Sequence, residues 1–264
     1  QKLAEAVAKR CGAGPLIELT TVKLDLERGI ARNAEFDLLD FDALIVKKLG
    51  HSYAPELLDR LEILHYVHER GVPVFSRPRT LMRLIDRLAC TVNLRLADVP
   101  MPPTFITESI DDAVEAARAM GRVVLKPLYT SKARGMELVD GDSPDLRERL
   151  AEFQAHGNPV LYLQKFFSIA RHDLGVVFLG GEYLASYSRV RQGDSWSTST
   201  SRGGRYQPYN PPPEVIEIAR RAQSVFDLAF TCVDVLETND GPLVFEVSAF
   251  GGFRGLLEAN GIAA

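Results

Sequence analysis

The segment from Thr231 to Ser248 limits the possible folds of this chain more than any other. It holds two apolar runs on either side of Asn239-Asp240-Gly241, a combination typical of a β-hairpin. If the loop centres on Asp240, residues equally far from it face each other, and Asp234 lies opposite Glu246. Side chains alternate between the faces of a strand, so Ser248 shares the face of Glu246.

Two facing acids are unfavourable in such a hairpin. Like charges directly opposite one another repel, and carboxylates among Val, Leu and Phe lose their hydration. A bound divalent cation would remove both objections, because hard cations such as magnesium take oxygen ligands. The alternative is an ordinary half-exposed hairpin in which water solvates both acids.

Composition indicates a soluble globular protein. The chain has 264 residues, of which 46% are hydrophobic and 25% charged, and this length suits one large domain or two to three small ones. The net charge of -4 implies no general affinity for nucleic acid or for an anionic membrane.

The cysteines and the hydropathy pattern indicate a cytoplasmic location. Cys11, Cys90 and Cys232 are odd in number and form no C-x-x-C pair, which argues against a disulfide framework and against a thiolate metal site. No apolar run approaches the roughly 20 residues that span a bilayer. We therefore expect a protein of the reducing cytoplasm that does not enter the membrane.

The first 76 residues alternate between strand and helix patterns. We expect strands at Leu16–Leu19, Ala43–Val46 and Val72–Phe75, and a helix from Pro55 to Arg70 that ends before Gly71. This order predicts a small parallel α/β layer.

Later segments predict a mixed α+β region. A helix is expected from Thr80 to Ala97, followed by a proline-rich linker, and Arg122–Pro127 reads as a strand. Gly180-Gly181 predicts the turn of another hairpin. Residues 196–213 are polar and rich in Gly and Pro, and we expect no regular element there.

Lys126 ends an apolar strand before a small loop that contains Ser131, Arg134 and Gly135. Such a loop can direct backbone N–H groups at a polyphosphate, with the lysine as a point charge. The alternative is a lysine that extends to water.

A second polar segment, Ser197–Arg205, combines hydroxyl groups with two arginines and the glycines Gly203 and Gly204. It suits anion recognition, and a disordered surface loop is the alternative. Arg189, at the end of the preceding strand, is a candidate for binding a carboxylate or phosphate, or else forms a surface ion pair. Asp173 is a candidate for a ribose hydroxyl or a cation, or else a strand-edge charge.

Taken in order, these pieces make residues 84–264 resemble the ATP-grasp ligases, and within them the RimK-like amino-acid ligases, including the tetrahydromethanopterin-type cofactor glutamate ligases. The resemblance rests on five segments that match in order and spacing: residues 123–135, 162–167, 172–174, 196–205 and 233–248.

The resemblance implies an α/β and α+β architecture, in which a small parallel α/β domain (1–76) precedes a two-lobed ATP-grasp fold. That fold would comprise a linker and helical part (77–122), a small lobe (123–167) and a C-terminal lobe with the metal site (168–264). ATP would bind between the lobes. The residues implied for ATP are Arg87, Lys126, Ser131, Arg134, Gly135, Gln164, Lys165, Phe166 and Asp173, with Gln164, Lys165 and Phe166 lining the adenine mainly through backbone groups.

The resemblance also implies catalytic and metal residues. Arg189 and Arg202 would face the reacting carboxylate, with Ser199, Gly203 and Gly204 in the substrate loop. Asp234, Glu246 and Ser248 would hold magnesium, with manganese as a substitute. The family usually has Asn where Ser248 stands, which leaves one ion or two open.

The activity implied is ATP-dependent amide formation through an acylphosphate. The substrates would be an amino acid such as glutamate and the carboxylate of a small biosynthetic intermediate, such as a pterin- or furan-type C1 carrier. A protein tail is the alternative acceptor. A degenerate ATP-grasp protein that binds nucleotide without turnover, and phosphotransfer without ligation, also stay open. The resemblance is compatible with a homo-oligomer.

Overall fold

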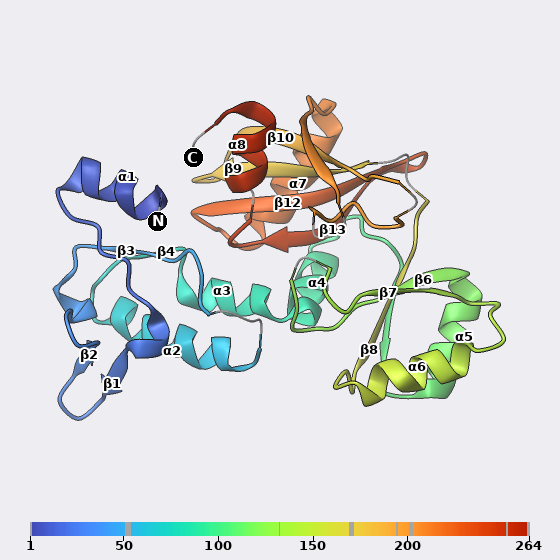
Figure 1. Ribbon diagram of the computed structural model, residues 1–264, viewed down its shortest axis with the longest axis horizontal. Helices are drawn as coiled ribbons and strands as arrows, with labels where there is room; N and C mark the ends of the chain where they lie inside the picture. Colours follow the sequence, from blue (N-terminus) through green and yellow to red (C-terminus); the bar gives the residue numbers. More distant parts are fainter. Residues whose placement is uncertain are drawn as a thin grey trace. The chain divides into compact units, whose positions relative to one another are not determined.

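The computed structural model describes residues 2–50, 54–131, 133–168, 172–193, 195–200, 203–251 and 253–262. The chain divides into two compact units, Gln1–Pro78 and Arg79–Ala264. Figure 1 labels most of the helices and strands of both units. No helix among the described residues is both long and apolar enough to cross a bilayer.

The first unit contains one strand–helix–strand crossover. β3 (Leu44–Ile45) pairs in parallel with β4 (Val74–Phe75), and α2 (Glu56–Glu69) lies between them in the chain. One stripe of α2, which includes Leu57, Leu61 and Leu64, is buried at helical spacing. The predicted parallel α/β layer is therefore confirmed.

The strand expected at Leu16–Leu19 is wrong. Leu16 is 71% exposed, and the chain instead forms a 3-10 turn at Leu19–Thr21. The remaining elements of this unit are α1 (Lys2–Cys11), the antiparallel pair β1 (Lys23–Asp25) and β2 (Ile30–Arg32), and a second 3-10 turn, Leu38–Asp40.

A four-stranded antiparallel sheet of order β5-β8-β6-β7 belongs to the second unit. The elements of this layer are β5 (Thr104–Thr107), α5 (Ile110–Met120), β6 (Arg122–Leu125), β7 (Glu137–Asp140), α6 (Leu146–Ala155) and β8 (Leu161–Lys165). Both helices pack on one face, against Val123 and Leu125 of β6 and Leu161 and Leu163 of β8. Alternation therefore directs Gln164 and Tyr162 to the other face.

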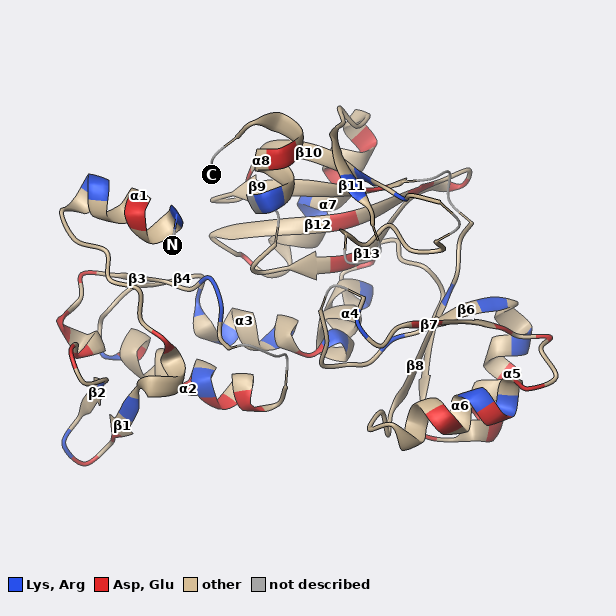
Figure 2. Ribbon diagram, in the orientation of Figure 1, with Lys and Arg blue, Asp and Glu red and all other residues tan. Residues whose placement is uncertain are grey.

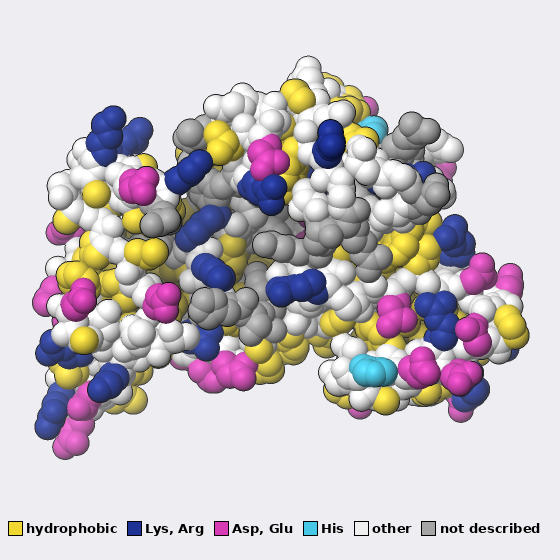
Figure 3. Space-filling view, viewed as in Figure 1, with side chains coloured by type: hydrophobic (Ala, Val, Ile, Leu, Met, Phe, Trp, Pro, Cys, Tyr) yellow, Lys and Arg dark blue, Asp and Glu magenta, His cyan; other side chains and the backbone are white. Residues whose placement is uncertain are grey.

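Charged side chains cover the outside of α5 and α6. Figure 2 shows basic and acidic residues interspersed along both helices, and Figure 3 shows the same mixture on the surface over them. Arg147 of α6 forms an ion pair with Asp111 of α5. The outer face of these helices is therefore a charged, solvated surface.

Five antiparallel strands form the second sheet of this unit, in the order β11-β10-β9-β12-β13. The strands are β9 (His172–Leu179), β10 (Glu182–Val190), β11 (Arg205–Pro208), β12 (Phe230–Thr238) and β13 (Gly241–Ser248). The hairpin predicted across Gly180-Gly181 is confirmed. β11 corrects the expectation of no regular element in residues 196–213, because its four residues gain a strand partner only in the folded sheet.

Helices lie on both faces of the five-stranded sheet. Leu256 of α8 (Phe253–Asn260) packs with Tyr187 and Cys232 on one face. Arg220 of α7 (Pro213–Ser224) lies 5.7 Å from the ring centre of Phe178, a residue of the opposite face. The inner strands β9 and β12 are therefore mostly buried.

The helix expected from Thr80 to Ala97 is two helices, α3 (Pro78–Ile85) and α4 (Arg87–Leu96). Asp86 separates them in an extended conformation, and its carboxylate accepts a hydrogen bond of 2.9 Å from the backbone N–H of Leu88. This N-cap ends the continuous helix that the apolar spacing predicts. It also places Arg87 at the first position of α4.

Candidate active site

The predicted pairing of Asp234 with Glu246 is confirmed. The turn itself has two residues, since Thr238 pairs with Gly241, and a β-bulge between Asp234 and Val235 then shifts the register. Beyond the bulge, Asp234 lies opposite Glu246 and Cys232 lies opposite Ser248. The bulge therefore creates the pairing that a loop centred on Asp240 would also have produced.

Arg189 joins two buried acids on this face of the sheet. Its Nε donates to Asp173 Oδ2 at 3.1 Å, and its Nη2 also donates to that oxygen and lies 3.0 Å from Asp234 Oδ1. Burial lowers the pKa of Arg189, but Asp173 and Asp234 together raise it well above its ordinary value. The structure thus directs Asp173 and Arg189 at each other.

Arg189 does not fully offset the negative charge at and around Asp234. Burial, together with the charges of Glu246 and Asp173, raises the pKa of Asp234 to about 7, against the opposing effect of Arg189. A further cation at this carboxylate would relieve the repulsion. The oxygen donors of Asp234, Glu246 and the half-buried Ser248 therefore fit a hard divalent cation.

Glu246 has its own arginine, from a distant part of the second unit. Arg87 Nη1 lies 3.3 Å from Glu246 Oε2, and Arg87 Nε donates to the carbonyl of Pro127 at 3.2 Å. Burial raises the pKa of Glu246, but Arg87 and Lys126 outweigh it and hold the pKa below its usual value. Two arginines therefore offset part of the negative charge of Asp234 and Glu246. A metal ion is thus not the only cation that can stabilise the two facing acids.

No group of three or more His, Cys, Asp or Glu side chains gathers as a metal site within the part of the chain that the structure describes. The predicted set differs in kind, because it joins two acids to the serine hydroxyl of Ser248. The backbone carbonyl of Ser248 accepts a hydrogen bond of 3.2 Å from Thr231 Oγ1. This bond fixes the end of β13 beside the two acids.

Lys126 lies just beyond β6 and is only 6% exposed. Its Nζ donates to Gln164 Oε1 and lies 5.4 Å from the ring centre of Phe245. Burial and the charge of Arg87 lower the pKa of Lys126 to about 7, against the opposing effects of Glu246 and Asp234. Its ammonium group therefore lies in a site that would favour an arriving anion.

Gln164 carries a side-chain function that the sequence interpretation missed, since it was expected to contribute mainly its backbone. Its Nε2 donates to Thr104 Oγ1 at 3.0 Å and to Tyr162 Oη at 3.3 Å, which leaves Oε1 for Lys126. The hydroxyl of Tyr162 is hydrogen-bonded in turn to Thr91 Oγ1 of α4, with 2.8 Å between the two oxygens. Strand alternation could have revealed Tyr162, because it shares the face of Gln164.

Phe166 and Lys165 follow Gln164 at the end of β8. The Phe166 ring lies 4.9 Å from the guanidinium carbon of Arg122 and meets Trp196 edge-on, with 6.3 Å between ring centres. Lys165 is exposed, with its Nζ 5.9 Å from the ring centre of Phe167. Trp196 thus connects the polar segment after β10 to the end of the four-stranded sheet.

The loop after Lys126 is closed by its own hydrogen bonds. Arg134 Nε donates to the carbonyl of Ser131 at 3.2 Å, and Arg134 Nη2 donates to Ser131 Oγ at 3.2 Å. Gly135 has a φ of +67°, a conformation that favours glycine. Three of the predicted phosphate residues therefore lie together in one compact turn.

Gly204 of the predicted substrate loop lies close to the backbone of Thr198 and Ser199. The N–H of Gly204 donates to the carbonyl of Ser199 at 3.1 Å, and a Cβ at Gly204 would lie 2.0 Å from the carbonyl oxygen of Thr198. Gly203 has a φ of +90°. Only glycine fits this approach at position 204. Arg202, the other predicted catalytic arginine, lies outside the described residues.

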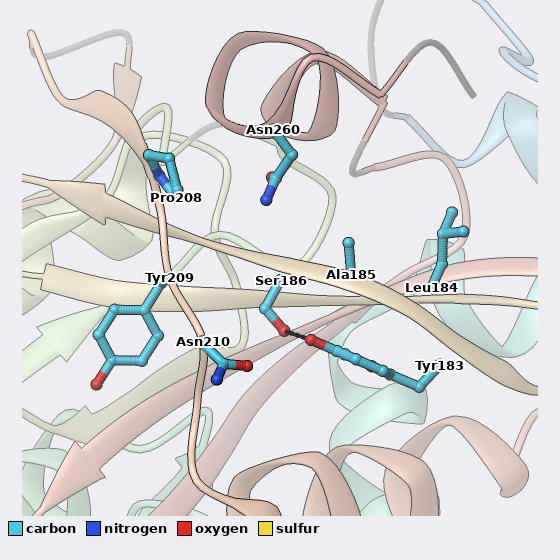
Figure 4. A pocket seen from close by; sticks show the side chains of 8 residues that line it. All are labelled: Tyr183, Leu184, Ala185, Ser186, Pro208, Tyr209, Asn210 and Asn260. Carbon is cyan, nitrogen blue, oxygen red and sulfur yellow. Dashed lines mark hydrogen bonds between the residues drawn. The ribbon is translucent and has the colours of Figure 1, made fainter.

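A separate cavity of about 370 Å³ lies beside β10 and is lined by Tyr183, Leu184, Ala185, Ser186, Pro208, Tyr209, Asn210 and Asn260. Figure 4 shows its uncharged lining and the hydrogen bond between Tyr183 and Ser186. None of the predicted site residues lines it. The predicted site residues around Lys126 and the acidic hairpin therefore lie outside this cavity.

Known proteins are similar to this chain in sequence and in fold. Residues 85–264 match the model of the RimK-like ATP-grasp domain. The chain is 26% identical over 254 residues to the tetrahydromethanopterin:alpha-L-glutamate ligase of Methanosarcina acetivorans, covering 86% of this chain and 78% of that relative. A RimK domain protein ATP-grasp from Sphaerobacter thermophilus superposes with a TM-score of 0.75 and 25% identity, over 97% of this chain and 88% of that one.

A third neighbour shows the fold with nucleotide and metal. The ATP-grasp ligase PsnB, complexed with a phosphomimetic variant of a minimal precursor, Mg and ADP, has a TM-score of 0.70 and 20% identity, over 98% of this chain and 89% of that chain. The predicted ATP-grasp fold is confirmed by these neighbours. The chain belongs to the RimK-like ATP-grasp family of ligases.

Proposed function

We propose that this protein joins the carboxylate of a small biosynthetic intermediate to the amine of an amino acid such as glutamate, with conversion of ATP to ADP and phosphate. The observation that carries the proposal is the pairing of Asp234 with Glu246, whose charges both act on the buried Lys126. The name of the methanogen relative, a tetrahydromethanopterin:alpha-L-glutamate ligase, supports a pterin-type acceptor and glutamate as donor.

Lys126 would bind the transferring phosphoryl group. Its ammonium group is already oriented by Gln164, so a phosphate oxygen would meet a donor in a fixed position. The turn that contains Ser131, Arg134 and Gly135 follows Lys126 directly, and its backbone N–H groups would approach the other phosphates. Phosphate recognition would thus begin from one strand end.

Asp234, Glu246 and Ser248 would hold magnesium, with the number of ions left to experiment. When bound, magnesium would neutralise the charge that passes between the γ-phosphate and ADP. Arg87 would keep Glu246 ionised and ready to bind the ion, because its guanidinium favours the charged carboxylate.

Arg189 would stabilise charge that develops at the substrate. Asp173 holds its guanidinium with three hydrogen bonds, which limits its rotation. The Nη2 that approaches Asp234 would then be the group nearest to an oxyanion formed beside the metal. Asp173 would act by orienting Arg189.

The reaction would proceed in two displacements. A carboxylate oxygen of the acceptor forms a bond to the γ-phosphorus of ATP, and the bond to ADP breaks. The amine nitrogen then bonds to the acyl carbon of this acylphosphate, phosphate leaves with the electron pair of the C–O bond, and the nitrogen loses a proton. Binding both substrates in one orientation supplies much of the acceleration.

The test incubates the protein with ATP, magnesium, a panel of small carboxylic acids that includes pterin- and furan-type C1 carriers, and a panel of amino acids. We expect ADP release that requires both an acid and an amine, with the amide detected by mass spectrometry. Lys126→Met should lose this activity and Lys165→Met should retain most of it, because only Lys126 is buried in the site.

Three outcomes would contradict the proposal. Tight ATP binding without turnover across the panel would identify a nucleotide-binding protein. A stable phosphorylated product without amide would identify a phosphotransferase. Activity restricted to a peptide or protein carboxylate would replace the small acceptor by a protein tail.

A further inference from the structure

Two buried residues outside the proposed machinery form a series of hydrogen bonds that ends at the Asp234 carboxylate. The hydroxyl of Tyr187 lies 3.4 Å from Cys232 Sγ, and Cys232 Sγ donates to Asp234 Oδ1 at 3.7 Å. Both side chains are 2% exposed. Neither residue was singled out by its sequence context.

The Asp234 carboxylate determines which group is the donor in each of these two hydrogen bonds. An ionised Asp234 can only accept hydrogen bonds, so the thiol proton must point toward it. The sulfur then has only acceptor capacity left for Tyr187, whose hydroxyl is the donor. One proton on each group satisfies both contacts, which run from β10 to β12.

The sheet register explains how a residue of β10 reaches β12. Gly175 of β9 pairs with Tyr187 on one side and with Asp234 on the other, so the three residues form one row across three strands. Because Gly175 has no side chain, the Tyr187 ring can lie across it. A Cβ at position 175 would be 2.4 Å from the ring carbon that carries the hydroxyl.

The Tyr187 ring also packs against α8 and β11. A Cβ at Gly255 of α8 would lie 2.4 Å from two carbons of the Tyr187 ring. Tyr206 of β11 meets the same ring edge-on, with 5.1 Å between ring centres. Gly175, α8 and β11 therefore enclose the ring, and its hydroxyl lies 3.4 Å from Cys232 Sγ.

We propose that Tyr187 and Cys232 are positioning residues, which orient the Asp234 carboxylate for the divalent cation through the thiol. The inference rests on the proposed magnesium site of the preceding subsection. Asp234 Oδ1 is then fixed from two sides, by Cys232 and by Arg189 at 3.0 Å. Groups that orient a metal ligand in this way commonly contribute tenfold or more to metal affinity.

Thiol chemistry is a poor alternative for Cys232. Cys232 is 2% exposed, so its sulfur is closed to external electrophiles and oxidants. A protonated thiol is the form that can donate to Asp234. The same burial therefore suits a positioning role.

The experiment measures Mn²⁺ binding in the presence of ATP by electron paramagnetic resonance, on the full chain. Tyr187→Phe keeps the ring and removes the hydroxyl, and Cys232→Ala removes the thiol donor. We expect each change to weaken Mn²⁺ binding about tenfold, and Cys232→Ser, which keeps a donor, to stay within about twofold of the parent protein. The KM for magnesium should rise more than kcat falls.

Two further variants of this protein make the test specific. Tyr183→Phe is the matched control, because Tyr183 lies on the same strand but bonds Ser186 at 3.0 Å, in the cavity of Figure 4. It should bind Mn²⁺ like the parent protein. The double variant Tyr187→Phe/Cys232→Ala should be no weaker than Cys232→Ala alone, because Tyr187 acts through the thiol.

Parent-like Mn²⁺ affinity in both Tyr187→Phe and Cys232→Ala would overturn the inference, as would fully additive losses in the double variant. A merely structural role would lower the melting temperature without changing metal affinity in the folded protein. If the parent protein itself bound no Mn²⁺ with ATP, the proposed magnesium site would fail first. The two failures are therefore distinguishable.

Discussion

Lys126 Nζ donates a hydrogen bond to Gln164 Oε1, which makes this glutamine the buried partner of the candidate phosphate lysine. Gln164 lies on β8 and Lys126 directly follows the neighbouring strand β6, on the face of the four-stranded sheet opposite α5 and α6. The amide of Gln164 is oriented by Thr104 and Tyr162, so the position of the lysine also depends on these two residues, through the glutamine.

Gln164→Leu should weaken ATP binding about tenfold and lower the free energy of unfolding by about 1–3 kcal/mol, because Lys126, Thr104 and Tyr162 each lose a buried partner. Calorimetric ATP binding and urea denaturation measure the two effects. Gln207→Leu, at an exposed glutamine of β11, is the control and should change neither. Unchanged ATP affinity in Gln164→Leu would show that the lysine needs no such support.

Lys126 should take up a proton when ATP binds. Its pKa of about 7 in the free protein leaves much of it neutral at pH 8, and the negative phosphates would favour the charged form. Calorimetry of ATP binding at pH 8 in buffers of different ionisation enthalpy should therefore show net proton uptake. The uptake should vanish in Lys126→Met and persist in Lys165→Met, and equal heats in all buffers would argue against it.

The stability of the protein should depend on pH through Asp234. Its folded pKa of about 7 exceeds the ordinary value of 3.8, so the folded state binds the proton more tightly than the unfolded chain. Linkage then gives stability that is fully present below pH 4 and is lost as the pH rises toward 7.

Asp234→Asn tests this sign. Relative to the variant, the parent protein should lose stability between pH 4 and pH 7, on the order of 1 kcal/mol for each unit of pKa difference. Urea denaturation of both proteins across this range measures the difference, in which other titrating groups largely cancel. A parent protein that instead gained stability between pH 4 and pH 7, relative to the variant, would contradict a raised pKa of Asp234.

Arg189→Ala should be strongly destabilising. The change leaves Asp173 and Asp234 buried without their shared cation, and breaking such a buried ion pair costs about 3–5 kcal/mol. Arg95→Ala, on the exposed side of α4, is the control and should stay within about 0.5 kcal/mol of the parent protein. A loss of activity in Arg189→Ala without a loss of stability would assign the arginine to chemistry alone.

Ser248→Asn should change the dependence on magnesium. Asparagine extends a longer neutral oxygen ligand than the serine hydroxyl, so we expect half-maximal activity at a lower magnesium concentration. Titration of activity against magnesium in both proteins measures this shift. Identical curves would mean that position 248 takes no part in holding an ion. Ser224→Asn, at an exposed serine at the end of α7, should reproduce the parent curve.

Much of the local structure could be predicted because it depends on local patterns. The β12–β13 hairpin follows from its turn residues and apolar runs, and α2 follows from leucines at helical spacing. β11 could not be predicted in this way, because its short polar sequence forms a strand only when β10 supplies hydrogen bonds. The split at Asp86 depends on a side-chain cap that a continuous apolar pattern conceals.

The sequence by itself determined the β12–β13 hairpin, the helix α2, the resemblance to the ATP-grasp ligases and the facing acids Asp234 and Glu246. Only the tertiary structure decided which cation meets which acid: Arg87 of α4 meets Glu246, and Arg189 of β10 meets Asp234 and Asp173. The physical reason is that periodicity records which face of an element a side chain occupies. The partner across that face comes from chain segments far apart in sequence, brought together only by packing.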